Sequence, residues 1–130
     1  AVLAGALGAR GVSLAGMIPS LTGYGFAVEQ RLAGRMAPPL TTGHATTVVS
    51  VAKAVAGALA ATGRDLADEV LAVVGLGSIG RATLELLLDR FPHPRRLILC
   101  DAPGSARRLA GLVDDLRRAD YGGEVEVAEG

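Results

Sequence analysis

The sequence predicts an α/β chain whose C-terminal half is a parallel sheet of strand–helix–strand–helix–strand order. Short apolar runs at 70–74, 97–100 and 125–128 alternate with two helical patterns, and a glycine-rich turn follows the first run. Half of the 130 residues are apolar, which is enough to build a core. Parallel strands joined in this way are connected by right-handed crossovers.

The N-terminal part contributes a strand and a long helix. In order, we expect a buried strand at 11–17, a loop at 19–25, a short helix at 26–36 stopped by two prolines, and a helix that follows the polar turn 41–44 and ends at Gly63. The long helix has Val48, Val51, Val55 and Leu59 at helical spacing. Lys53 is its only charge and is expected on the solvent side.

The C-terminal part is predicted element by element. The run 70–74 is apolar on both faces, as in a central parallel strand. The following helices are expected at 78–90 and 105–119. Their inward residues are expected to be Ile79, Ala82, Leu86 and Leu87 in the first helix, and Leu109, Leu112, Val113 and Leu116 in the second. Three strands make a small sheet, so the N-terminal elements or a partner chain, as in a homo-oligomer, must help to cover it.

The charge balance excludes several classes of partner. Thirteen basic and thirteen acidic residues give a net charge of zero, which favours neither a nucleic acid nor an anionic membrane surface. The apolar stretch 1–28 is broken by Arg10 and Pro19, so we expect no membrane span there. The single cysteine, Cys100, permits no disulfide within the chain, and no cluster has metal-ligand spacing. A cytoplasmic protein without a metal is expected.

The strongest functional signal is the turn after residue 74. Gly75, Gly77 and Gly80 form a G-x-G-x-x-G pattern that follows a strand and opens a helix. In the dinucleotide-binding Rossmann unit, the first glycine allows the tight turn, the second lets the pyrophosphate approach the backbone, and the third lets the helix pack closely on the strand. The predicted cofactor-binding residues of this loop are Gly75, Leu76, Gly77, Ser78, Ile79 and Gly80.

An acidic residue stands where the ribose of such a cofactor is bound. Asp101 ends the second strand, and its carboxylate is expected to accept hydrogen bonds from the 2′- and 3′-hydroxyls. A 2′-phosphate would meet like charge, so the sequence predicts NAD as cofactor in preference to NADP. Arg107 and Arg108 could reach a 2′-phosphate if the loop 102–104 folded inward, but we expect solvated charges on a helix face.

Other residues carry weaker signals. His44 and Thr42 are candidate catalytic or substrate-orienting residues, although helix capping is the more common role of such residues, as it is for Thr41. His93 is expected in a loop and Cys100 in the core. Two readings of the glycine turn remain open beside the dinucleotide: S-adenosylmethionine, which uses a similar turn, and a structural turn without ligand.

The order of these segments resembles the aldehyde-forming long-chain acyl-[acyl carrier protein] reductases. More broadly, it is similar to dehydrogenases in which a catalytic domain precedes the Rossmann domain, such as shikimate dehydrogenase and glutamyl-tRNA reductase. The resemblance extends from about Gly11 to Asp101. It is carried by Thr41, Thr42, Gly43 and Thr47 in the turn, by Gly63, Asp65 and Leu66 before the strand, and by Gly75, Gly77, Ser78, Ile79 and Gly80 in the loop.

The resemblance implies an NAD(P)-dependent oxidoreductase that reduces an acyl thioester to an aldehyde through a covalent cysteine. Cys100 departs from this pattern because it is not at the position of that nucleophile, and Asp101 departs from the NADPH use of the reductases. We interpret 1–63 as the end of a preceding catalytic or substrate domain with a connecting helix, and 64–130 as the first half of the Rossmann domain. Such a fragment is expected to lack turnover by itself, because later strands build the nicotinamide half-site.

Two other function classes compete with an oxidoreductase. In a non-catalytic nucleotide-binding module the ligand is a sensor signal or a structural clamp. In a scaffold domain the glycine turn holds no ligand at all. A nucleotide titration separates the last class from the other two.

Overall fold

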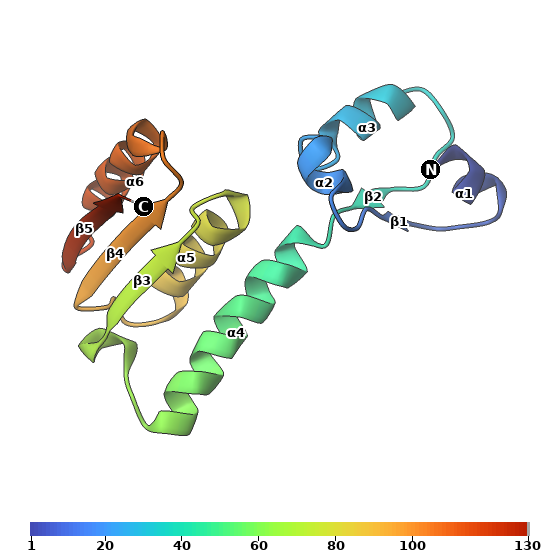
Figure 1. Cartoon of the computed structure of the whole chain (residues 1–130). Coiled ribbons are helices and arrows are strands. Elements are labelled where there is room, and N and C mark those ends of the chain that lie inside the picture. Colours follow the sequence, from blue (N-terminus) through green and yellow to red (C-terminus); the bar gives the residue numbers. More distant parts are fainter. Residues whose placement is uncertain (130) are drawn as a thin grey trace. The chain divides into compact units, whose positions relative to one another are not determined.

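The computed structural model describes residues 1–129 of the chain (Figure 1). The chain divides into two compact units, Ala1–Thr47 and Val48–Gly130. The division falls inside helix α4 (His44–Thr62), whereas the sequence suggested a boundary after residue 63. Most of the long helix therefore belongs with the C-terminal unit.

The C-terminal unit is built on a parallel sheet of three strands. They are β3 (Val70–Val74), β4 (Arg96–Asp101) and β5 (Glu124–Glu129), in the spatial order β3-β4-β5. Helix α5 (Ser78–Arg90) connects β3 to β4, and helix α6 (Ala106–Arg118) connects β4 to β5; a short 3-10 helix, Leu66–Asp68, precedes β3. The arrows of β3, β4 and β5 in Figure 1 point the same way. The predicted alternation of strands and helices is confirmed.

A core of leucines fills one face of this sheet. Leu97 and Leu99 of β4 are fully buried. They pack with residues of the glycine loop and both helices, namely Leu76, Leu84, Leu109, Leu112 and Leu116. Because strand residues two apart point to the same face, the partly buried Leu71, Val73 and Val125 complete this layer.

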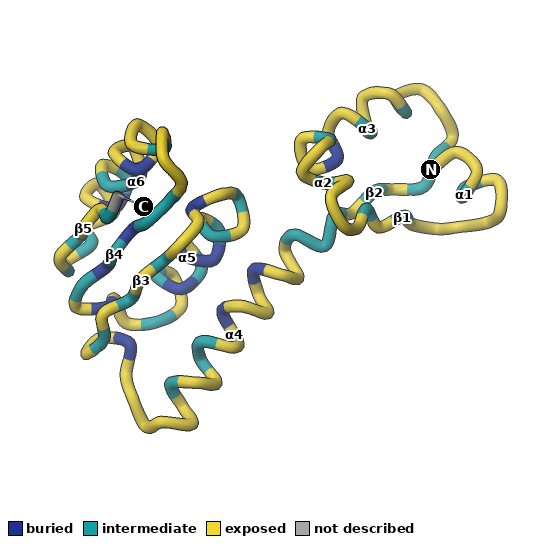
Figure 2. The backbone as a smooth tube through the Cα atoms, in the orientation of Figure 1, coloured by how far each residue is buried: buried dark blue, intermediate teal, exposed yellow. Residues whose placement is uncertain are grey.

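The opposite face of the sheet is largely open within the described chain. Val70 and Val74 of β3 are 42% and 79% exposed (Figure 2). Ala72 and Val74 pair in register with Ile98 and Cys100, which are only half-buried. The prediction that 70–74 is a central strand is therefore wrong: in the described sheet β4 is central and β3 is at an edge, and the outer face of β3 is open because α5 and α6 both pack on the other side.

The sequence predicted the inward face of α6 correctly and that of α5 only in part. In α6, Leu109, Leu112 and Leu116 are buried and Val113 is half-buried, as predicted. In α5 the buried residues are Thr83, Leu84 and Leu87, while Ala82 and Leu86 are half-buried and Ile79 is 39% exposed. The prediction is thus confirmed for Leu87 and wrong for Ile79, and it is Gly80 rather than Ile79 that packs against Gly75 at the end of β3.

The N-terminal unit consists of short elements. These are α1 (Val2–Ala6), β1 (Val12–Ser13), α2 (Ile18–Leu21), α3 (Phe26–Leu32) and β2 (Leu40–Thr41), and β1 pairs with β2 in parallel. The strand predicted at 11–17 has only two residues, and Gly16, with φ at +60°, cannot extend it. The predicted loop 19–25 contains part of α2, and the helix predicted at 26–36 ends at Leu32. Gly25 is the only buried residue of this unit.

Helix α4 begins and ends close to where the sequence predicts. Gly63, with φ at +64°, follows it in the left-handed conformation of a C-terminal cap, and Lys53 is exposed. Val48 and Ala52 are its buried residues. By length and composition α4 could cross a membrane. Core helices of soluble proteins pass the same test, so a single such helix is weak evidence.

Candidate functional site

The glycine loop leaves the carboxyl end of β3 in a sharp turn. Gly75 has φ at +87°, a conformation that favours glycine, and its N–H donates to the carbonyl oxygen of Cys100 at 2.9 Å. This bond continues the β3–β4 ladder into the loop. Leu76 then turns inward and is 2% exposed, so the loop is anchored in the core.

Gly80 packs directly against the start of this loop. A Cβ atom at Gly80 would lie 2.0 Å from the carbonyl oxygen of Gly75, which no side chain tolerates. Glycine at this position therefore lets α5 approach the end of β3. This is the packing role predicted for the third glycine.

Gly77 has open space where its side chain would be. A Cβ atom there would meet no atom within 4 Å, and the φ of −65° and ψ of −169° are accessible to any residue. Its glycine identity is therefore not required by the fold itself. Gly77 is also the N-cap of α5, and no side chain in the described structure caps that helix end. The first turn of α5 thus offers backbone N–H groups and the positive end of the helix dipole.

The two residues between Gly77 and Gly80 are exposed or half-buried. Ser78 is half-buried, and Ile79 is exposed beside it. Both belong to the first turn of α5, where their backbone N–H groups have no partner one turn earlier in the helix. Their exposure leaves these N–H groups near solvent.

Asp101 lies at the end of β4, next to the glycine loop. The backbone N–H of Ala102 donates to its Oδ1 at 2.8 Å, and the guanidinium of Arg108 donates to its Oδ2. The backbone of Leu76 lies near enough to add a smaller effect on the same carboxylate. These contacts, with the Ala102 bond as the largest cause, lower the pKa of Asp101 below its ordinary value. The structure thus brings together the loop and the acid that the sequence predicted as one site.

The structure corrects the expectation for one of the two arginines. Arg108 was expected to be a solvated charge, but it forms an ion pair with Asp101 from the first turn of α6. Arg107 is exposed and forms no ion pair within the described chain, as expected. The sequence offers little signal for this pair, because its members are seven positions apart across a loop and the start of a helix.

A hollow of about 200 Å³ adjoins Asp101, and sequence reasoning missed it. It lies between the loop after β4, the start of α6 and the end of β5. Its lining includes Pro103, Ser105, Leu109, Val127 and Ala128. The hollow is therefore largely apolar and has a carboxylate at its edge.

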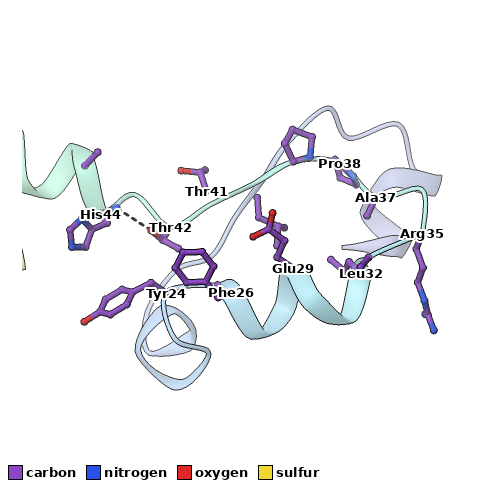
Figure 3. A pocket seen from close by; sticks show the side chains of 15 residues that line it. Tyr24, Phe26, Glu29, Leu32, Arg35, Ala37, Pro38, Thr41, Thr42 and His44 are labelled. Atoms are coloured by element: carbon purple, nitrogen blue, oxygen red, sulfur yellow. Dashed lines mark hydrogen bonds between the residues drawn. The ribbon is translucent and has the colours of Figure 1, made fainter. Parts of the chain in front are cut away.

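His44 and Thr42 lie in a second place, a cavity of about 730 Å³ within the N-terminal unit (Figure 3). The N–H of His44 donates to Oγ1 of Thr42 at 3.4 Å, and the ring of Tyr24 meets the ring of His44 edge-on at 5.6 Å. Tyr24 and His44 lie at one end of the cavity and Arg35 at the other. Thr41 also lines it. This cavity combines aromatic and apolar walls with hydroxyl, imidazole and carboxylate groups.

The remaining candidates, His93 and Cys100, lie in a loop and in a strand. His93 is exposed in the loop before β4 and its ring lies 5.3 Å from that of Tyr121. Cys100 is a free, half-buried thiol on the open face of the sheet, rather than a fully buried core residue. Within residues 1–129, no three His, Cys, Asp or Glu side chains are grouped to hold a metal ion.

Comparisons with known proteins give no relative for this chain. No family model matches it, and neither a curated protein nor a solved structure is significantly similar to it.

Proposed function

We propose that the C-terminal unit binds a nicotinamide dinucleotide, as half of a Rossmann-like fold, and serves as the cofactor-binding part of an oxidoreductase. The observation that carries the proposal is the position of Asp101. Its carboxylate lies at the carboxyl end of β4, beside the backbone of Leu76 in the glycine loop. Ligands of open parallel sheets bind outside the carboxyl ends of the strands.

The residues at this site fit the adenosine and pyrophosphate parts of such a cofactor. The open space at Gly77 can accept a phosphate group close to the backbone, where the first turn of α5 offers its N–H groups. Asp101 would hold the ribose hydroxyls, and the apolar hollow beside it has room for part of a flat base. When bound, the nicotinamide would supply or accept a hydride.

NAD is the proposed cofactor in preference to NADP, because the carboxylate of Asp101 opposes a 2′-phosphate. We propose an acyl thioester as the substrate, as the resemblance implies. The cavity around His44 and Thr42 is the candidate for groups that orient such a substrate. The half-buried Cys100 is not proposed as a nucleophile, since it belongs to a strand and no base is hydrogen-bonded to it in the described structure.

Calorimetric titration tests the proposal. The folded chain should bind NAD and ADP-ribose in the high-micromolar to millimolar range, and S-adenosylmethionine more weakly. Absence of binding by NAD and ADP-ribose at millimolar ligand, with native circular dichroism, would overturn it. Tighter binding of S-adenosylmethionine would favour that ligand class instead.

A turnover assay separates an oxidoreductase from a non-catalytic module. NADH oxidation in the presence of acyl thioesters is measured for the longest protein that contains this chain. Nucleotide binding without any turnover over a range of thioesters and aldehydes would favour the sensor or structural module.

A further inference from the structure

The carboxylate of Asp101 is already engaged on both oxygens. Ala102 N–H donates to Oδ1 at 2.8 Å, and Arg108 donates to Oδ2. The Asp101 side chain is only 9% exposed, whereas the Arg108 side chain is 55% exposed. Arg108 is therefore the more exposed partner of the pair, on the solvent side of a carboxylate that also accepts a backbone hydrogen bond.

This arrangement affects two kinds of ribose in opposite ways. A ribose with free 2′- and 3′-hydroxyls donates to the same carboxylate, and Arg108 already fills one of the acceptor positions on Oδ2, so Arg108 competes with the ribose. A ribose with a 2′-phosphate is repelled by Asp101, but the guanidinium beside that carboxylate offsets the repulsion and is a preferred partner of phosphate.

We propose that Arg108, through its ion pair with Asp101, sets the preference of this site between a 2′-hydroxyl and a 2′-phosphate nucleotide. The inference rests on the proposed nucleotide function. Arg108 weakens binding of the 2′-hydroxyl form and strengthens binding of the 2′-phosphate form. Arg108 therefore makes the difference in affinity between NAD and NADP smaller than an unpaired aspartate would make it.

The neighbouring arginine provides a matched control. Arg107 carries the same charge on the same turn of α6 but forms no ion pair in the described part of the chain. A general attraction of α6 for anionic ligands would make Arg107→Ala and Arg108→Ala behave alike. If the effect acts through Asp101, only Arg108→Ala changes the preference between the two nucleotides.

The experiment titrates ADP-ribose and 2′-phospho-ADP-ribose into the parent chain, Arg107→Ala and Arg108→Ala. Exposed ion pairs are weak, so the expected changes are about two- to fivefold. Arg108→Ala should bind ADP-ribose about two- to fivefold more tightly and 2′-phospho-ADP-ribose about two- to fivefold more weakly. Arg107→Ala should weaken both ligands slightly and equally.

Opposite changes in Arg108→Ala alone support the proposal. Equal weakening of both ligands, or no change in either, overturns it while the nucleotide function stands. Carboxyl NMR of Asp101 reports on the pair without any ligand: the pKa of Asp101 should rise in Arg108→Ala and not in Arg107→Ala. If no variant binds either nucleotide, the proposed function fails and this inference fails with it, even where NMR detects the pair.

Discussion

The Cβ position of Gly80 lies 2.0 Å from the carbonyl oxygen of Gly75, so the start of α5 rests on the backbone that leaves β3. The obstacle is backbone, which cannot rotate away as a side chain can. Glycine at position 80 is therefore required by the fold, whether or not a ligand binds, while Gly75 is favoured for its φ of +87°.

Gly80→Ala should destabilise the chain by about 3 kcal/mol, the upper end of the usual cost of overpacking. The methyl group must push α5 away from β3 and disturb the core around Leu76 and Leu84. Urea unfolding followed by circular dichroism measures the change. The control is Gly111→Ala on the exposed side of α6, where a Cβ meets nothing within 4 Å. It should stabilise by about 0.5–1 kcal/mol, because alanine is the better helix former. Equal effects of the two substitutions would contradict the packing described for Gly80.

Gly77→Val should abolish nucleotide binding and leave the fold intact. The backbone at Gly77 suits any residue, and the new side chain enters the open space proposed for the phosphates. Calorimetry with ADP-ribose measures binding, and urea unfolding measures stability, which should fall by less than about 1 kcal/mol. Gly77→Ala should give an intermediate loss of affinity. Unchanged ADP-ribose binding in the valine variant would show that phosphate does not approach this loop.

The sequence predicts the C-terminal unit well because its signals are local. Helix α5 spans 78–90 as predicted, since Gly77 precedes it and Phe91-Pro92 follows it. Asp101 ends β4 as predicted, because an apolar run must end where the chain leaves the core. The glycine loop, the end of β4 and the position of Asp101 can therefore be predicted from residue spacing alone.

The remaining features depend on contacts between residues that no spacing rule connects. The pairing of Val12 with Leu40 joins two strands of two residues each, too short for a periodic signal. The inward face of α5 follows from the contact of Gly80 with Gly75, which buries Thr83 and exposes Ile79. The Asp101–Arg108 pair depends on the path of the loop between β4 and α6.

Thr83→Val should raise the free energy of unfolding by about 1 kcal/mol. Thr83 is 7% exposed, and its hydroxyl has no hydrogen-bond partner within the described chain. Valine has nearly the same shape and a similar helix propensity, so the change removes only an unsatisfied polar group. The control is Thr62→Val, since the hydroxyl of Thr62 donates to the carbonyl oxygen of Ala58 at 2.8 Å and the side chain is exposed. That variant should be neutral or slightly destabilised in urea unfolding. A loss of stability in Thr83→Val would indicate that the hydroxyl has a bound water or another partner.

The lowered pKa of Asp101 predicts an acid-sensitive contribution to stability. In the folded chain the pKa lies below the ordinary value of 3.8, so the folded state favours the charged carboxylate. The contribution is therefore fully present above about pH 4 and is lost as the pH falls through the lowered pKa. Asp101→Asn removes the titrating group, so its unfolding free energy should depend less steeply on pH below 4 than that of the parent.

A second variant separates the causes of that shift. The N–H of Ala102 is the largest single cause and is unaffected by substitution of Arg108, so Arg108→Ala should return the pKa of Asp101 only part of the way to its ordinary value. Urea unfolding between pH 2 and pH 6 measures the stability, and carboxyl NMR measures the pKa directly. Since the backbone bond survives in Arg108→Ala, some acid sensitivity must remain. A full return of the pKa in that variant would mean that the ion pair, rather than the Ala102 N–H, fixes the charge of Asp101. Identical pH dependence in the parent and Asp101→Asn would mean that the carboxylate adds no pH-dependent stability at all.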